Sequence, residues 1–295
     1  MWVKPWNMKE GFFIGGGLFL IGLLLQAALG PVCWDLFGWP VNLFVLVLLL
    51  TVIGVMYALR RKVYFFEWMM HAGAAVPCLA YAASLTILMG LLPQVGEGGI
   101  PWLSQMLRFW PFVLIWTWMM LISAMAALNH LLRWKVKEIP FVLNHLGVFV
   151  AIVAATLGNA DVRSLQVTAF TGEPEWRAVD EYGDVVEPGL AIELHRFTME
   201  EYPDHTPKRF ASDITVYLED GGSVSGTVEV NKPLKVNGWK IYQYSSDVKR
   251  GPDSPYSVFQ LVRDPWLPWV YAGIFMMLAG ALCLMLFMAP KPVRQ

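Results

Sequence analysis

Six runs of about twenty apolar residues, the length that an α-helix needs to cross a bilayer, constrain this chain more than any other feature. They lie at about 11–30, 40–59, 69–92, 109–132, 139–158 and 266–289. Hydrophobic residues make up 56% of the 295 residues and charged residues only 15%. That balance excludes an ordinary soluble enzyme and a disordered chain. We therefore expect an α-helical polytopic membrane protein with six transmembrane helices.

The spans divide the chain into three parts. Residues 1–159 form a five-helix membrane region, 160–265 a water-facing domain with frequent charges, and 266–295 the sixth helix and a tail. The first run follows Lys4 and Lys9 without a small-residue cleavage site, so it is predicted to be a retained helix.

Basic residues beside the spans predict the orientation. With the N-terminus and C-terminus inside, only Arg108 of eleven flanking basic residues lies on the far side. The inside set is Lys4, Lys9, Arg60, Arg61, Lys62, Arg133, Lys135, Lys137, Lys291 and Arg294. The sequence therefore predicts a multi-pass protein of the cytoplasmic (inner) membrane, with 160–265 on the extracytoplasmic, periplasmic side. That domain holds 18 acidic and 11 basic residues, which argues against nucleic acid as a partner.

Alternating apolar residues predict that the inserted domain is β-rich. Residues 212–218 and 223–230 alternate on either side of a Glu-Asp-Gly-Gly turn signal, and 236–239 (Val-Asn-Gly-Trp) is typical of a second hairpin turn before a strand at 240–244. Strands without intervening helical patterns favour an antiparallel sandwich or a barrel-like sheet.

Three histidines fall within the spans, where an ionisable side chain is costly and is a candidate for function. His145 lies about six residues inside the fifth helix, roughly 9 Å deep at 1.5 Å per residue. His130 ends the fourth helix and His71 opens the third, so all three lie toward the inner leaflet. They could ligate a metal or a haem iron. A hydrogen bond to a neighbouring helix, or snorkelling of His71 and His130 to the interface, explains them equally well.

Other patterns offer no chemistry of their own. His195 and His205, among acidic neighbours, are typical of a solvated surface rather than of a metal cluster. The cysteines, Cys33, Cys78 and Cys283, form no C-x-x-C pair, so thiol redox chemistry must come from other proteins. The sequence holds no phosphate-binding loop, nucleophile elbow or H-E-x-x-H motif. No catalytic residue is assigned.

Four stretches over about 143–290 resemble the ResB (CcsB) family of system II cytochrome c biogenesis. They are 143–149 with 157–161, 210–216, 230–243 and 264–268. The third resembles the family's "VNxPL…G…IYQ" strand pair. Its matching residues are Asn231, Pro233, Leu234, Gly238, Tyr242 and Gln243. Residues 1–135 look like the extra helices of longer family variants.

The resemblance implies a haem-handling membrane subunit. Such a protein works with a CcsA (ResC) partner, holds haem b without a covalent bond, and helps deliver it to the outer side for attachment to C-x-x-C-H of an apocytochrome c. His145 matches the position of one of the transmembrane haem ligands. His71 and His130 remain ligand candidates from the residues alone. Thiol-reducing proteins are possible further partners.

The chain also lacks parts of a complete synthase. It has no W-x-W-x-x-W-D loop, so it is expected to be a subunit of a haem lyase complex that does not complete ligation alone. Two other functions stay open. One is a b-type haem electron-transfer subunit with paired histidines, and the other is a non-catalytic assembly scaffold.

Overall fold

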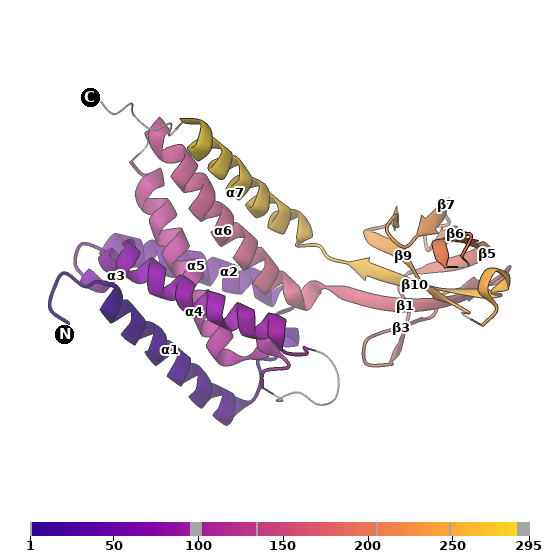
Figure 1. The fold of residues 1–295 in the computed structure, drawn as a ribbon, viewed down its shortest axis with the longest axis horizontal. Coiled ribbons are helices and arrows are strands. Elements are labelled where there is room, and N and C mark those ends of the chain that lie inside the picture. Colours follow the sequence, from indigo (N-terminus) through magenta and orange to yellow (C-terminus); the bar gives the residue numbers. More distant parts are fainter. Residues whose placement is uncertain (1, 95–101, 134, 205, 248, 288–295) are drawn as a thin grey trace. The chain divides into compact units, whose positions relative to one another are not determined.

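The chain forms two compact units in a computed structural model that describes residues 2–94, 102–133, 135–204, 206–247 and 249–287. The helical unit comprises residues up to 160 together with those from 266 onward, and the β-domain comprises Asp161–Pro265 (Figure 1). Lys291 and Arg294 of the predicted inner tail, and His205, lie outside the described residues.

Six long helices of the helical unit are apolar and long enough to cross a membrane, as the sequence predicts. They are α1 (Met8–Leu29), α2 (Val41–Leu59), α4 (Ala72–Leu91), α5 (Trp110–Leu131), α6 (Ile139–Gly158) and α7 (Leu267–Phe287). The shorter helices are η1 (Trp34–Phe37), α3 (Tyr64–Trp68), η2 (Met106–Arg108), η3 (Val136–Glu138) and η4 (Asn159–Asp161).

Local chemistry sets several helix ends. The Asn7 side chain accepts from the Lys9 N–H at 2.8 Å, and the Glu10 carboxylate accepts from the Asn7 N–H at 3.0 Å. This capping box satisfies donors that α1 would otherwise leave free. Pro111 and Pro140 lie in the first turns of α5 and α6, where a missing N–H costs nothing.

The predicted third span differs at its start. The expected helix from residue 69 is interrupted, since α3 ends at Trp68 and α4 begins at Ala72. His71 is the residue before α4 and has an extended backbone, at φ −112° and ψ 159°. It is exposed and precedes the helix instead of lying within it.

Close contacts through glycine hold the helices together. Helix α5 is the most buried of the six, with 61% of its apolar stretch inside the structure, so it lies at the centre of the unit. Helices α6 and α7 lie side by side (Figure 1). A Cβ added at Gly273 of α7 would lie 2.6 Å from the Gly147 carbonyl oxygen and 2.6 Å from the Ala151 nitrogen of α6. Only hydrogen fits there, which is how small residues let membrane helices approach.

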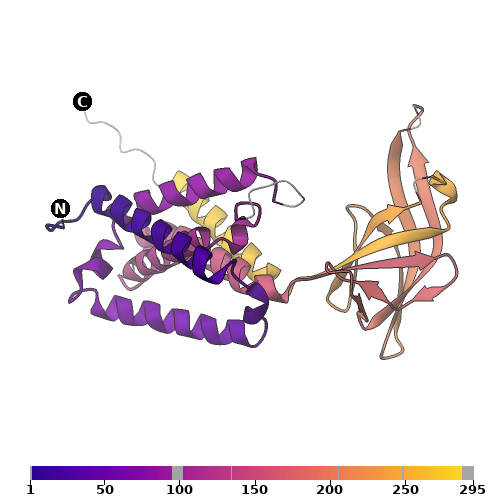
Figure 2. The same cartoon turned by 90° about the horizontal axis from the view of Figure 1, so that it is seen from below.

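The β-domain consists of two antiparallel sheets, and its strands are drawn from a second side in Figure 2. The six-stranded sheet has the order β4-β3-β1-β10-β9-β8, and the four-stranded sheet the order β2-β5-β6-β7. The strands are β1 (Arg163–Phe170), β2 (Pro174–Glu175), β3 (Ala178–Val179), β4 (Val185–Val186), β5 (Leu190–Glu201), β6 (Pro207–Leu218), β7 (Ser223–Glu229), β8 (Leu234–Val236), β9 (Trp239–Ser246) and β10 (Tyr256–Arg263). A short helix, η5 (Gly251–Asp253), precedes β10.

One apolar core lies between the two sheets. Its fully buried members come from both, including Val167 and Phe259 of the larger sheet and Ile192 and Val216 of the smaller. Strands β6 and β7 confirm the strands that the sequence predicts at 212–218 and 223–230. Strands β1 to β5 and β10 were not predicted from the sequence. Strands β2, β3 and β4 are only two residues long and carry no measurable alternation, whereas β1, β5 and β10 do alternate and were missed.

Candidate functional site

Two of the three predicted histidines lie together where α5 ends and α6 begins. His130 is in the last turn of α5, and His145 is in the second turn of α6. The short connection through η3 brings the two helix ends close, because a brief link makes neighbours antiparallel. Both imidazoles are half-buried.

The phenyl ring of Phe141 lies between the two imidazoles. Its centroid is 3.9 Å from that of His130, with an interplanar angle of 32°, and 3.8 Å from that of His145, at 17°. Two rings cannot stack on the same face at such distances, so His130 and His145 cover opposite faces of Phe141. The three residues therefore form a sandwich, which we call the His130–Phe141–His145 stack.

The proton on His145 follows from its hydrogen bond. Its Nδ1 lies 3.0 Å from the carbonyl oxygen of Phe141, four residues earlier in the same helix. A carbonyl only accepts, so Nδ1 carries the proton. In the neutral imidazole Nε2 then holds a free lone pair, which is the form that binds a metal or a haem iron.

Glu138 holds the other imidazole. Its Oε2 lies 2.6 Å from His130 Nδ1, and the two side chains are 17% and 22% exposed. A carboxylate on Nδ1 fixes the orientation of a histidine ring and leaves Nε2 pointing elsewhere. Sequence reasoning missed both Glu138 and Phe141. The four-residue spacing of Phe141 and His145 is the signal that could have indicated the contact.

His71 is not brought to this stack. In the part of the chain that the structure describes, no hydrogen bond or ring contact joins it to His130 or His145. No group of three or more His, Cys, Asp or Glu residues able to hold a metal ion is found among the described residues either. A haem iron needs only one or two imidazole ligands, so the lack of a three-residue group does not argue against haem binding.

The donor set at the stack fits a haem iron at one position. His145 offers an unprotonated Nε2 on a helix of membrane length. The faces of His130 and His145, not their nitrogens, are turned toward each other across Phe141. One iron shared by both imidazoles would therefore require Phe141 to move, whereas ligation by His145 alone would not.

The six motif residues of the β-domain lie in and around the β8–β9 hairpin. Asn237 and Gly238 have positive φ values of 47° and 81°, as a type I′ turn requires. Leu234 packs against Gly226, where a Cβ would lie only 2.9 Å from the Leu234 side chain. Asn231 and Pro233 flank Lys232, which bridges back to Glu229 through two backbone hydrogen bonds.

Gln243, the last of these motif residues, lies in a buried polar cluster. Its Oε1 accepts from the Ser212 hydroxyl at 2.6 Å, and its Nε2 donates to the Ser245 carbonyl at 2.9 Å. Ser257 completes the cluster, 2.8 Å from Ser212. Tyr242, on the opposite face of β9, is half-buried. The motif residues thus account for a turn and a core cluster, and a structural role explains them.

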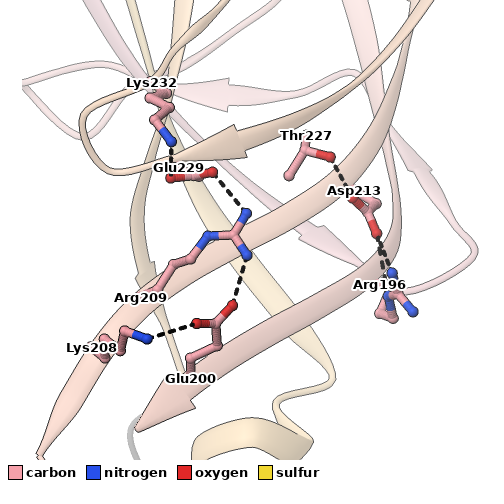
Figure 3. A network of polar contacts seen from close by, with 8 residues as sticks. All are labelled: Arg196, Glu200, Lys208, Arg209, Asp213, Thr227, Glu229 and Lys232. Atoms are coloured by element: carbon pink, nitrogen blue, oxygen red, sulfur yellow. Dashed lines mark hydrogen bonds and ion pairs between the residues drawn. The ribbon is translucent and has the colours of Figure 1, made fainter. Parts of the chain in front are cut away.

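Charged side chains on the four-stranded sheet are paired with one another (Figure 3). Arg209 donates to Glu200 at 2.8 Å and to Glu229 at 2.7 Å, and these bonds hold the pKa of both carboxyls below its usual range. Arg196 pairs with Asp213. These side chains neutralise one another locally, so they do not form a single-sign patch.

His195 lies at a bulge in β5 and belongs to the same sheet. Its Nε2 is 2.7 Å from the Thr215 hydroxyl, and its Nδ1 is 3.7 Å from Glu193. The side chain is 46% exposed. These contacts agree with the solvated surface that the sequence predicts.

Comparison with known proteins locates the family resemblance. Residues 135–254, which hold α6, His145 and most of the β-domain, match the model of the ResB-like family. Over this segment the chain is similar to the ResB-like family. The resemblance inferred from the motifs is confirmed there, whereas residues 1–134 and 255–295, including the motif stretch at 264–268, lie outside the match.

The named relatives of this chain are cytochrome c biogenesis proteins. Two proteins named cytochrome c biogenesis protein CcsB, from Prochlorococcus marinus strains NATL1A and NATL2A, are each 29% identical over 102 residues. That is 35% of this chain, and the chain spans only 23% of each relative. A solved structure titled cytochrome c haem lyase CcmF aligns with 96% of this chain and 46% of its own, at 14% identity and a TM-score of 0.41.

Proposed function

We propose that this chain is a ResB-type subunit of a system II cytochrome c synthase. It would bind haem b without a covalent bond within the membrane and help deliver it to C-x-x-C-H of an apocytochrome c on the outer side. The family match and the names of the two relatives support a role in cytochrome c maturation. A CcsA (ResC)-type protein would be its partner, since this chain lacks the W-x-W-x-x-W-D loop.

One observation supports the haem proposal above the others. His145 lies on a helix of membrane length, and its Nδ1 is committed to the Phe141 carbonyl at 3.0 Å. The remaining nitrogen, Nε2, is then a neutral donor to iron, and ligation would satisfy an otherwise costly polar group. A bound haem would supply the vinyl groups that react with the thiols of the client protein.

The protein's own contribution would be to bind and orient. His145 would hold the iron, and the apolar side chains of the helical unit would exclude water from the porphyrin. The β-domain would hold the apocytochrome or the partner protein close to the delivered haem, and proximity of this kind raises the effective concentration of the two thiols. In the proposed orientation both termini lie on the cytoplasmic side of the inner membrane. The β-domain would then lie on the extracytoplasmic side, where such clients are found.

The test is the haem spectrum of the detergent-purified chain, alone and co-expressed with a CcsA-type partner. The variant His145→Gly should lose the Soret band, and added imidazole should restore it by filling the vacated ligand position. His195→Gly in the β-domain is the matched control and should keep the wild-type spectrum. Equal haem in wild type and His145→Gly would overturn the ligand assignment.

Two outcomes would favour other functions. Haem that is stable and reversibly redox-active without any partner would favour a b-type electron-transfer subunit. Absence of haem from every preparation, with the helices intact, would favour an assembly scaffold.

A further inference from the structure

We propose that Glu138 and His130 are positioning residues that hold His145 in its iron-binding orientation through the ring of Phe141. This inference rests on the proposed function, since it concerns the same ligand. It gives His130 a role distinct from that of a second iron ligand. The proposal follows from four contacts that connect Glu138 to His145, the last two of which both join Phe141 to His145.

The first contact fixes the His130 ring. Glu138 ends η3 just before α6, and its carboxylate lies 2.6 Å from His130 Nδ1 at the end of α5. A separation this short is typical of a charge-assisted hydrogen bond. The contact closes the connection between the two helices and holds the imidazole plane against the Phe141 ring.

The next two contacts link the position of the His130 ring to that of the His145 ring. The His130 ring covers one face of Phe141 at 3.9 Å, and the His145 ring covers the other at 3.8 Å. With both faces occupied, Phe141 has no free side toward which to rotate. The His145 ring lies nearly parallel to Phe141, at 17°, so a shift of Phe141 would shift the imidazole as well.

The fourth contact sets the tautomer. The backbone carbonyl of Phe141 accepts from His145 Nδ1 at 3.0 Å, which leaves Nε2 unprotonated. Phe141 therefore controls both the plane of the imidazole, through its ring, and its proton, through its carbonyl. Partners of a metal-binding histidine commonly have this double role of fixing orientation and tautomer.

The sandwich argues against ligation of the same iron by His130. Two imidazoles that share an iron point a nitrogen at it from opposite sides. Here the two rings present their faces to an intervening phenyl ring instead. A positioning residue at 130 needs only an aromatic ring, whereas an iron ligand needs a nitrogen. The substitution His130→Phe therefore distinguishes the two roles.

The first readout needs no haem. Full-length protein labelled with ¹⁵N-histidine in micelles should show His145, assigned with His145→Gly, as one Nδ1-protonated tautomer. His130→Phe keeps a ring against Phe141 and should leave that signal unchanged. His130→Ala and Glu138→Ala should split or broaden it. An unchanged His145 signal in His130→Ala would overturn the proposal.

The second readout is haem titration of the same variants. His130→Ala should weaken haem binding by about 2- to 10-fold, the effect of losing one aromatic ring contact. His130→Phe should bind haem within about twofold of wild type and keep the same spin state in its ferric spectrum. If His130→Phe instead changes the spin state of the ferric haem relative to wild type, His130 is a ligand and the positioning role is wrong.

The two proposals can fail separately. Haem binding that does not depend on His145 would overturn the ligand assignment, while the NMR signals would still report whether Glu138 and His130 order that ring. Haem binding that depends on His145 but is indifferent to His130→Ala would overturn only the positioning role.

Discussion

The ring of Phe141 stacks on the imidazole of His145, with centroids 3.8 Å apart and an angle of 17° between the planes. The same phenyl ring contacts His130 on its other face. Aromatic pairs of this kind contribute about 0.5–1.5 kcal/mol each beyond the area they bury. The stack therefore stabilises the junction of α5 and α6 as well as orienting a candidate ligand.

Replacing Phe141 should measurably destabilise the helical unit. We expect Phe141→Ala to lower the free energy of unfolding by about 1–3 kcal/mol, since it removes one stacked and one tilted ring contact and leaves a gap. Thermal unfolding in detergent, followed by circular dichroism, is the measurement. Phe275→Ala on α7 is the matched control, because that side chain is 66% exposed. Equal losses for the two variants would contradict a structural role for the stack.

The contact between α6 and α7 should tolerate no side chain at Gly273. A Cβ there would lie 2.6 Å from backbone atoms of Gly147 and Ala151, which cannot move aside cheaply. Gly273→Val should cost about 1–3 kcal/mol by overpacking, and a lower thermal midpoint in detergent would show it. Gly54→Ala on α2, where nothing lies within 4 Å, should leave the midpoint unchanged or raise it.

Acid should destabilise the β-domain through the Arg209 network. Hydrogen bonds from Arg209 lower the pKa of Glu200 and Glu229 in the folded protein. Stability from these carboxylates is therefore present above their unfolded pKa, about 4.3, and is lost as the pH falls through the lowered folded values. Arg209→Met should start less stable at pH 7 and lose less on acidification than wild type.

The urea midpoint of the full-length chain at several pH values checks this expectation. A fluorine label on Trp239, which is buried in the β-domain, would report the unfolding of that unit alone. Arg250→Met is the control, since the ion pair of the Arg250 side chain with Asp247 is long, at 3.8 Å, and the arginine side chain is 64% exposed. An Arg209→Met profile parallel to that of wild type would exclude the network as a source of the acid sensitivity.

The proposed orientation predicts which cysteine reacts from outside the cell. Cys33 is exposed in the connection between α1 and α2, whereas Cys78 is buried in α4. With the N-terminus inside, that connection faces outward. A membrane-impermeant maleimide added to intact cells should therefore label the protein, and Cys33→Ser should abolish the labelling. Labelling of Cys33 only after the membrane is opened would reverse the topology.

The β-domain illustrates how far a local pattern can predict structure. The turn at Asn237 and Gly238 is predicted correctly, because a two-residue turn depends only on the backbone preferences of its own residues. Sequence alone did not indicate the cluster of Ser212, Gln243 and Ser257. These three belong to β6, β9 and β10, and they meet only because the two sheets pack together.

The sequence by itself determined that the chain has six long apolar helices, a β-rich insertion and a histidine within α6. Each of those features depends on the hydropathy of one segment, or on the spacing of its apolar residues, and does not depend on contacts with other segments. Only the tertiary structure decided that His130 and His145 flank Phe141 and that Glu138 holds His130. It also placed His71 just before α4 instead of within that helix. Such contacts depend on the angle and distance at which α5 meets α6, and side-chain packing between helices fixes those quantities.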